Sequence, residues 1–118
     1  MLSIICRFRV KPEWADKWLE LTSDFTEATR AERANLWFVW TRNVDEPTEF
    51  FLIEAHHEEL VEEHLGNPLI PRIVAEWPQA LVEQPTMLMT TIAGTEWQLM
   101  DRMPVPAAST AAAGEQRR

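Results

Sequence analysis

Two apolar runs that send large side chains toward both faces of a sheet constrain this fold most. The runs are LWFVWTR over residues 36–42 and EFFLIEAH over residues 49–56, and the turn-forming segment NVDEPT separates them. Side chains alternate between the faces of a strand, so each run presents Trp, Phe or aliphatic groups on both sides. An antiparallel sheet with one wet face would carry polar residues there. These strands therefore predict a sheet that is covered on both faces.

The remaining patterns complete an alternating order of strands and helices. They predict a strand over 2–10, an amphipathic helix over 13–33, the two strands over 36–42 and 49–56, a short helix over 57–65, a second short helix that starts at Asn67-Pro68 and carries residues 70–77, and a strand over 86–92. This β-α-β-β-α-β order is the ferredoxin-like arrangement, an α+β fold. We expect one domain over 1–93, an amphipathic C-terminal extension over 94–103 and a flexible tail over 104–118.

The ferredoxin-like arrangement places its helices on one face, which leaves the second apolar face bare. Leaving three aromatic side chains in water forgoes on the order of 10 kcal/mol, at about 25 cal/mol per Å² and about 150–250 Å² each. That loss is comparable with the stability of a whole domain. We therefore expect a homodimer in which the bare faces of two copies meet, with the sheets facing each other or closed into a common α/β barrel.

Charge and composition exclude several classes of protein. The formal net charge of −8 repels phosphate backbones and anionic membrane surfaces, so we expect no nucleic-acid or membrane partner. No apolar run approaches the roughly 18 residues of a membrane span. Arg7 and Arg9 interrupt the N-terminal apolar stretch, which does not have the pattern of a signal peptide. The single cysteine, Cys6, forms no internal disulfide, and a reducing cytoplasm is the expected location.

All three histidines of the chain, His56, His57 and His64, lie between Glu54 and Ile70. On a helical wheel His64 falls in the middle of the apolar stripe of the helix predicted over 57–65. The opposite, solvent-facing side of this helix consists of Glu58, Glu59, Glu62 and Glu63. The sequence therefore predicts that the His64 side chain points toward the protein interior.

Three interpretations of these histidines differ in the chemistry they imply. A metal site is not predicted, because His57 and His64 are two helical turns apart and His56 could meet His64 only through the fold. A core histidine that makes one hydrogen bond is the plainest interpretation. The third interpretation is acid–base catalysis, since a histidine in an apolar cleft keeps its neutral form near pH 7 and can accept a substrate proton.

Other residues are candidates for contacts with a ligand. Glu54 precedes the histidines and is either a strand-end charge at the rim or half-buried, and Arg7 and Arg9 are rim residues or partners for Glu54. Arg72 either steers an anionic or phenolic substrate or is a solvated helix arginine. Most Trp residues belong to the core, and Trp37 or Trp40 could line a flat aromatic pocket.

The chain resembles the antibiotic biosynthesis monooxygenase (quinol monooxygenase-like) family. Glu54 with His56, the segment EEHLGNP around His64 and Pro68, and the order of elements from LSIICRFRVKPEW to PTMLMTTI carry this resemblance over about residues 1–92. Three features depart from the family pattern. His56 takes the place of a frequent Trp, Leu69 the place of a second histidine, and one residue is missing between strand and helix.

The resemblance implies a dimeric α+β barrel that oxidises quinols or phenolic polyketides with O2 and uses no flavin, haem or metal. His64 would then take the phenolic proton, His56 would assist or hydrogen-bond the oxyanion, and Trp37 and Trp40 would shape the pocket. The alternative is a non-catalytic dimeric barrel that binds a small hydrophobic ligand, as in a stress response. Haem degradation, the activity of a related branch of such proteins, fits less well. The helix tryptophan of the haem-degrading branch corresponds to His64 here, and its haem-ligating histidine falls near Val74.

Overall fold

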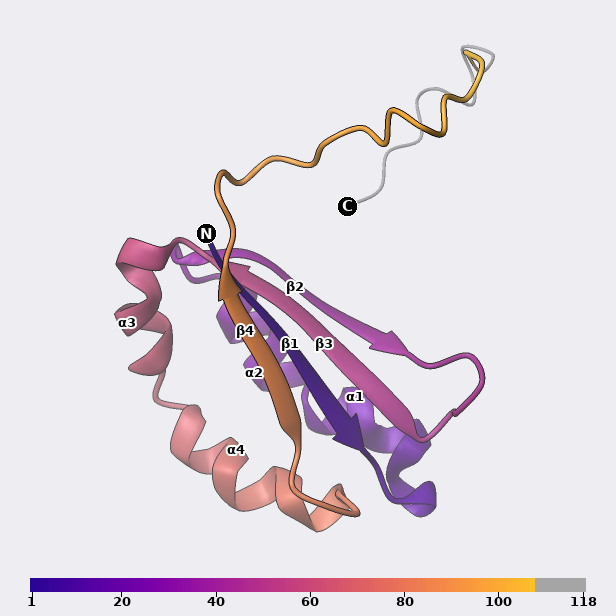
Figure 1. Ribbon diagram of the computed structural model, residues 1–118. Helices are drawn as coiled ribbons and strands as arrows, with labels where there is room; N and C mark the ends of the chain where they lie inside the picture. Colours follow the sequence, from indigo (N-terminus) through magenta and orange to yellow (C-terminus); the bar gives the residue numbers. More distant parts are fainter. Residues whose placement is uncertain (108–118) are drawn as a thin grey trace.

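The computed structural model describes residues 1–107 and places four antiparallel strands in one sheet with all helices on one face (Figure 1). The strands are β1 (Leu2–Arg9), β2 (Asn35–Arg42), β3 (Glu49–His56) and β4 (Thr86–Thr91). Their order in the sheet is β2-β3-β1-β4, so the first strand and the third strand are central. The predicted β-α-β-β-α-β order of a ferredoxin-like α+β fold is confirmed.

The helices are shorter and more interrupted than the sequence pattern predicts. In chain order they are the 3-10 helix η1 (Pro12–Lys17), α1 (Trp18–Leu21), α2 (Ser23–Arg30), the 3-10 helix η2 (Glu58–Leu60), α3 (Val61–Leu65), α4 (Ile70–Glu76) and the 3-10 helix η3 (Trp77–Ala80). In the first turn of α2 the hydroxyls of Ser23 and Thr26 donate to backbone carbonyls three and four residues earlier, at 2.8 and 2.9 Å. Such bonds compete with the helical ladder and bend helices, which explains the break in the helix predicted over 13–33.

The core lies between the sheet and the helices and is mainly aromatic. Trp18 of α1 is completely buried, and its ring lies 5.3–5.7 Å from the rings of Phe8, Trp40 and Trp77. Because residues i and i+2 of a strand share a face, the helix-facing side of β3 carries Phe50 and Leu52 and, farther along, Glu54 and His56. The sheet thus passes from a dry aromatic centre to a polar end on the same face.

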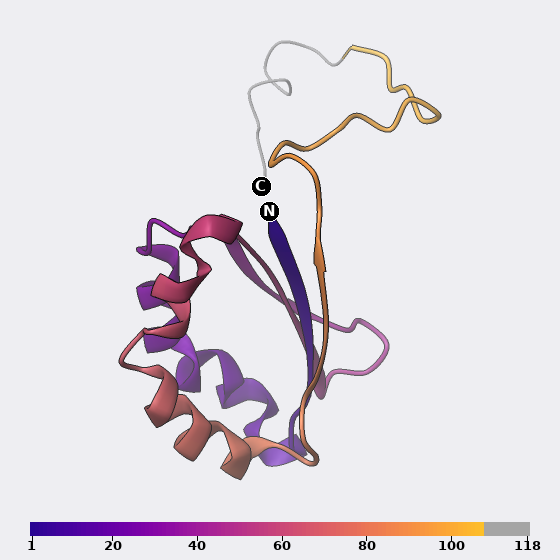
Figure 2. The ribbon, with the colours of Figure 1, turned by 60° about the vertical axis from the view of Figure 1, so that its left-hand side comes forward.

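The opposite face of the sheet carries an apolar row that no helix within residues 1–107 covers. The strand register places Val39, Ile53, Ile5 and Leu88 side by side across all four strands. Ile5 is 38 % exposed and Leu88 is 73 % exposed. Figure 2 shows the helices on one side of the sheet only, so the face that carries this row is bare, as expected from the sequence.

The C-terminal extension runs away from the sheet beyond the end of β4 (Figures 1 and 2). Between residues 94 and 107 the described chain forms turns and contains no helix or strand. Trp97, Leu99 and Met100 are exposed, and the Trp97 ring lies 5.3 Å from that of Trp37 on the bare face. Of the tail predicted over 104–118, residues 108–118 lie outside the described residues. Within residues 1–107, no helix has the length and apolar character needed to cross a membrane.

Candidate active site

Two histidines meet at the polar end of the helix-facing side of the sheet. His56 is the last residue of β3, and His64 lies in α3, which packs over this end of the sheet. Their rings stack with centroids 4.4 Å apart and an interplanar angle of 26°. His56 is completely buried and His64 is 7 % exposed, so the inward orientation predicted for His64 is confirmed. The fold brings His56, rather than its neighbour His57, to His64.

A buried carboxylate contacts each of the two rings. Glu54 Oε1 lies 2.7 Å from Nε2 of His56 and 3.7 Å from Nε2 of His64. Glu32 Oε1, from the turn after α2, lies 2.7 Å from Nδ1 of His64. The Asn67 amide donates to the second oxygen of Glu32 at 2.7 Å and thereby fixes the orientation of that carboxylate. The four ionisable side chains and the amide form one network that we call the histidine–glutamate cluster.

The hydrogen bonds fix which ring nitrogens carry hydrogen. An ionised carboxylate only accepts, so the Nδ1–H of His64 donates to Glu32 and the Nε2–H of His56 donates to Glu54. A neutral His64 then keeps a lone pair on Nε2, and a neutral His56 keeps one on Nδ1. Nδ1 of His56 has no hydrogen-bond partner among the described residues. Buried polar atoms without partners are rare, and such an atom often marks a functional site.

Cys6 borders the cluster from the neighbouring strand β1. Its thiol sulfur lies 3.9 Å from Oε2 of Glu54. Burial raises the pKa of the Cys6 thiol to about 12, and the charge of Glu54 and the hydrogen bond to it act in the same direction. The thiol therefore stays protonated near neutral pH and donates to Glu54 rather than acting as a nucleophile.

The helix-facing side of β4 is incompletely covered. The register pairs Met87 with Cys6 and Met89 with Ile4, and directly paired residues point to the same face of a sheet. Although this face is buried on the central strands, Met87 is 54 % and Met89 is 58 % exposed. The two methionines offer an accessible, adaptable apolar surface on the same face as Cys6, which itself contacts Glu54 of the cluster.

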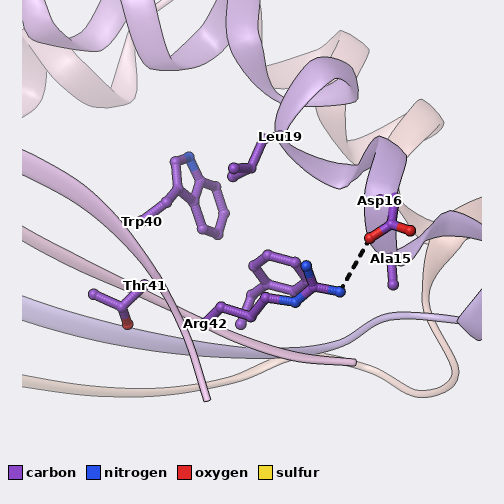
Figure 3. Close-up of a pocket in the computed structure, with 7 residues that line it drawn as sticks. Ala15, Asp16, Leu19, Trp40, Thr41 and Arg42 are labelled. Carbon is purple, nitrogen blue, oxygen red and sulfur yellow. Dashed lines mark hydrogen bonds and ion pairs between the residues drawn. The ribbon is translucent and has the colours of Figure 1, made fainter. Parts of the chain in front are cut away.

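A separate pocket of about 200 Å³ lies at the other end of the sheet (Figure 3). Trp40, Arg42 and Leu19 line it, and Arg42 closes one side through a 3.3 Å contact with Asp16. It contains no histidine, and its one carboxylate, that of Asp16, is 92 % exposed and paired with Arg42. Acid–base catalysis requires a proton acceptor that is held in position beside the substrate. We therefore place the candidate active site at the histidine–glutamate cluster and not at this pocket.

The structure separates the other predicted substrate-binding residues from the histidines. Trp37 lies on the bare face against Trp97, whereas Trp40 lies in the core with its indole Nε1 donating to Thr26 at 2.9 Å. The two side chains point to opposite faces of β2 and cannot line one pocket in a single chain. Arg72 is on the surface of α4, where it pairs with Asp24 at 2.8 Å.

The interpretation of Glu54 as a rim charge is wrong, because Glu54 is only 6 % exposed and belongs to the cluster. Arg9 is paired with Glu49 and Glu83 rather than with Glu54. The reason is register, since Glu54 follows Leu52 on the covered face of β3 while Arg9 lies on the bare face at the far end of β1.

Glu32 and Asn67 belong to the cluster but were not predicted from the sequence. Glu32 lies at the end of the predicted helix and resembles any solvated helix glutamate, and Asn67 has the pattern of a turn residue before a proline. Their link to each other spans 35 residues of sequence. No local pattern reports a contact of that separation.

Comparisons with known proteins agree with this architecture. A crystal structure of an antibiotic biosynthesis monooxygenase is 23 % identical, covers 80 % of this chain and 100 % of its own, and has a TM-score of 0.69. Rv0793 from Mycobacterium tuberculosis is 20 % identical over 79 % of this chain and 95 % of its own, with a TM-score of 0.70. PA3566 from Pseudomonas aeruginosa is 17 % identical over 79 % of this chain and 94 % of its own, with a TM-score of 0.66.

At these identities the solved structures show a shared fold. No match was found among curated proteins. The sequence itself matches the antibiotic biosynthesis monooxygenase family over residues 1–76, which is more than half of the chain and includes Glu32, Glu54, His56 and His64. The chain therefore belongs to the antibiotic biosynthesis monooxygenase family.

Proposed function

We propose that this protein is a cofactor-independent monooxygenase that oxidises a quinol or a phenolic, polyketide-like aromatic with O2. The observation that carries the proposal is the pairing of His64 with Glu32 at 2.7 Å in a nearly dry site. Glu32 holds the ring with Nδ1 protonated, which leaves Nε2 as the base. A carboxylate that orients a histidine and stabilises its protonated form is a recurring arrangement for proton abstraction.

The reaction starts with proton transfer from the substrate hydroxyl to Nε2 of His64. The electron-rich phenolate then passes one electron to O2, and the resulting radical and superoxide combine at a ring carbon that bears hydrogen. The peroxide takes the proton back from His64 and loses water, so that a CH2 group in the keto form of the substrate becomes a carbonyl. One oxygen atom of O2 enters the product and the other leaves as water, and substrate carbon supplies the four electrons.

The surroundings of the histidines favour this chemistry over hydrolysis. Met87 and Met89 offer an apolar surface for a flat aromatic ring on the face that carries the cluster. A dry site protects a radical pair from protons and water. His56 lies behind His64 and is completely buried, so it acts through the stacked ring and Glu54 and not by touching the substrate.

We also propose that two copies associate through the bare face. The apolar row of Val39, Ile53, Ile5 and Leu88 lies in the middle of that face. Burial of this row against its own copy removes apolar surface from water in both protomers and satisfies the requirement of a closed, two-fold contact. Trp37 and Trp97 flank the row and would extend the contact.

Oxygen consumption tests the catalytic proposal. Protein dialysed against a chelator and supplied with menadiol or an anthrone should take up O2 above the uncatalysed rate, and His64→Ala should abolish this excess. His57→Ala is the matched control, because His57 lies on the surface near Glu59 and outside the cluster. If the wild-type protein consumes no more O2 than His64→Ala, the proposal is refuted. Quenching of tryptophan fluorescence by a quinone without O2 uptake would instead support a binding protein.

A further inference from the structure

We infer that Glu32, His56 and His64 form a binding site for a divalent transition-metal ion such as Zn²⁺. One ligand atom from each of the three side chains lies within 4.8 Å of the other two. His57 and His64 are too far apart along one helix to share an ion, whereas the fold brings His56 to His64 instead. This inference does not rest on the oxygenase activity, which is proposed for the metal-free form, in which Nδ1 of His64 donates to Glu32.

The hydrogen bonds identify which atoms would bind the ion. His64 turns Nδ1 toward Glu32, and both rings turn Nε2 toward Glu54. The nitrogen of His56 that has no partner among the described residues is Nδ1. We therefore assign Nδ1 of His56, Nδ1 of His64 and a carboxylate oxygen of Glu32 as ligands. Two imidazoles and one carboxylate are a common ligand set for zinc and iron, with further positions left for water or substrate.

The second layer of contacts suits a metal site. A histidine that binds a metal usually donates its other N–H to a carboxylate, which fixes the ring and increases its basicity. Nε2 of His56 makes this bond to Glu54 at 2.7 Å. Asn67 holds the distal oxygen of Glu32, so the proximal oxygen is free to turn from His64 to the ion.

Charge balance also favours a cation. Glu32 and Glu54 are both largely buried, and their only partners within 4 Å that can carry positive charge, among residues 1–107, are His56 and His64. Two carboxylates buried in a medium of low dielectric constant are costly unless positive charge lies beside them. A divalent ion balances both charges.

Binding requires a small rearrangement of the cluster. Ligands at about 2.0–2.1 Å from a tetrahedral zinc ion lie roughly 3.3 Å from one another. The Glu32 and His64 atoms, 2.7 Å apart, must therefore separate slightly, while atoms as far apart as 4.8 Å must approach by on the order of 1 Å. An ion lies in the plane of each ring that binds it, and the stacked rings must therefore open from their 26° angle. Rotation of His64 about its side-chain bonds supplies this movement, because His64 lies on the short helix α3 and not in the sheet.

Equilibrium dialysis of chelator-stripped protein against Zn²⁺, followed by elemental analysis, tests the inference. The wild-type protein and His57→Ala should each bind one Zn²⁺ per chain, and Glu32→Gln and His56→Phe should bind at least tenfold more weakly. Circular dichroism checks that the variants fold. If His56→Phe does not fold, Glu32→Gln still tests the site, because glutamine has the shape of glutamate.

Two results would overturn the metal site. One is the absence of a stoichiometric ion in the wild-type protein, and the other is unchanged affinity in the folded Glu32→Gln variant. The readout is bound metal and not turnover, whereas the O2-uptake assay uses chelated protein. Failure of one proposal is therefore distinguishable from failure of the other.

Discussion

Ile53→Glu is the sharpest perturbation of the proposed association between two copies. Ile53 sits in the middle of the apolar row on the bare face, paired with Val39 on one side and with Ile5 on the other. In the single chain Ile53 is only partly covered, so a glutamate there can stay solvated and the folded protomer should persist. In a two-fold contact through this face, both introduced carboxylates would be buried.

The magnitude follows from burial and charge. Loss of the Ile53 side chain from a buried contact removes about 1.5–3 kcal/mol per protomer. An unpaired buried carboxylate costs several kcal/mol more. Two-fold symmetry doubles both terms, which brings the total to on the order of 10 kcal/mol. A dimer with a micromolar dissociation constant is held together by about 8 kcal/mol, so the substitution should abolish it.

Sedimentation velocity at micromolar concentration measures the outcome. The wild-type chain should sediment as a dimer and Ile53→Glu as a folded monomer with unchanged far-ultraviolet circular dichroism. Val44→Glu is the matched control, because Val44 is 92 % exposed in the loop between β2 and β3 and should leave the dimer intact. A wild-type monomer, or an Ile53→Glu dimer, would show that the bare face is not the contact.

Three further outcomes follow from burial and from the raised pKa of Cys6. Because that pKa is raised from 9.0 to about 12, iodoacetamide at pH 9 should modify folded Cys6 much more slowly than the urea-unfolded chain, and equal rates would contradict the burial argument. The Cys6 thiol of the unfolded chain releases its proton at lower pH than the thiol of the folded chain. The contribution of Cys6 to stability is therefore complete below pH 9.0 and is lost as the pH rises toward about 12. Urea unfolding at a series of pH values measures this loss. Trp18→Ala should lower the free energy of unfolding by about 3–5 kcal/mol, because Trp18 is completely buried. Trp97→Ala should lower it by no more than about 1 kcal/mol, since Trp97 is 77 % exposed. Similar urea midpoints for the two variants would refute this contrast.

Local periodicity predicted the parts of this protein that depend on neighbours in sequence. Alternation over residues 36–42 and 49–56 identified the strands β2 and β3 and the apolar surface that the helices leave bare. The position of His64 among apolar residues identified its inward orientation. The length of the first helix was predicted less well, because hydroxyl side chains such as that of Thr26 bond to backbone carbonyls and interrupt it.

The amino-acid sequence by itself determined the order of the strands and helices, the surplus of apolar surface on the sheet and the direction of His64. Each of these follows from side-chain spacing along one segment, which is a local property. Only the tertiary structure decided that His56 and not His57 stacks on His64, that Glu54 is buried and that Glu32 meets His64 from 32 residues away. Those contacts depend on strand register and on how α3 packs over the sheet, and side-chain spacing within one segment contains no information about either.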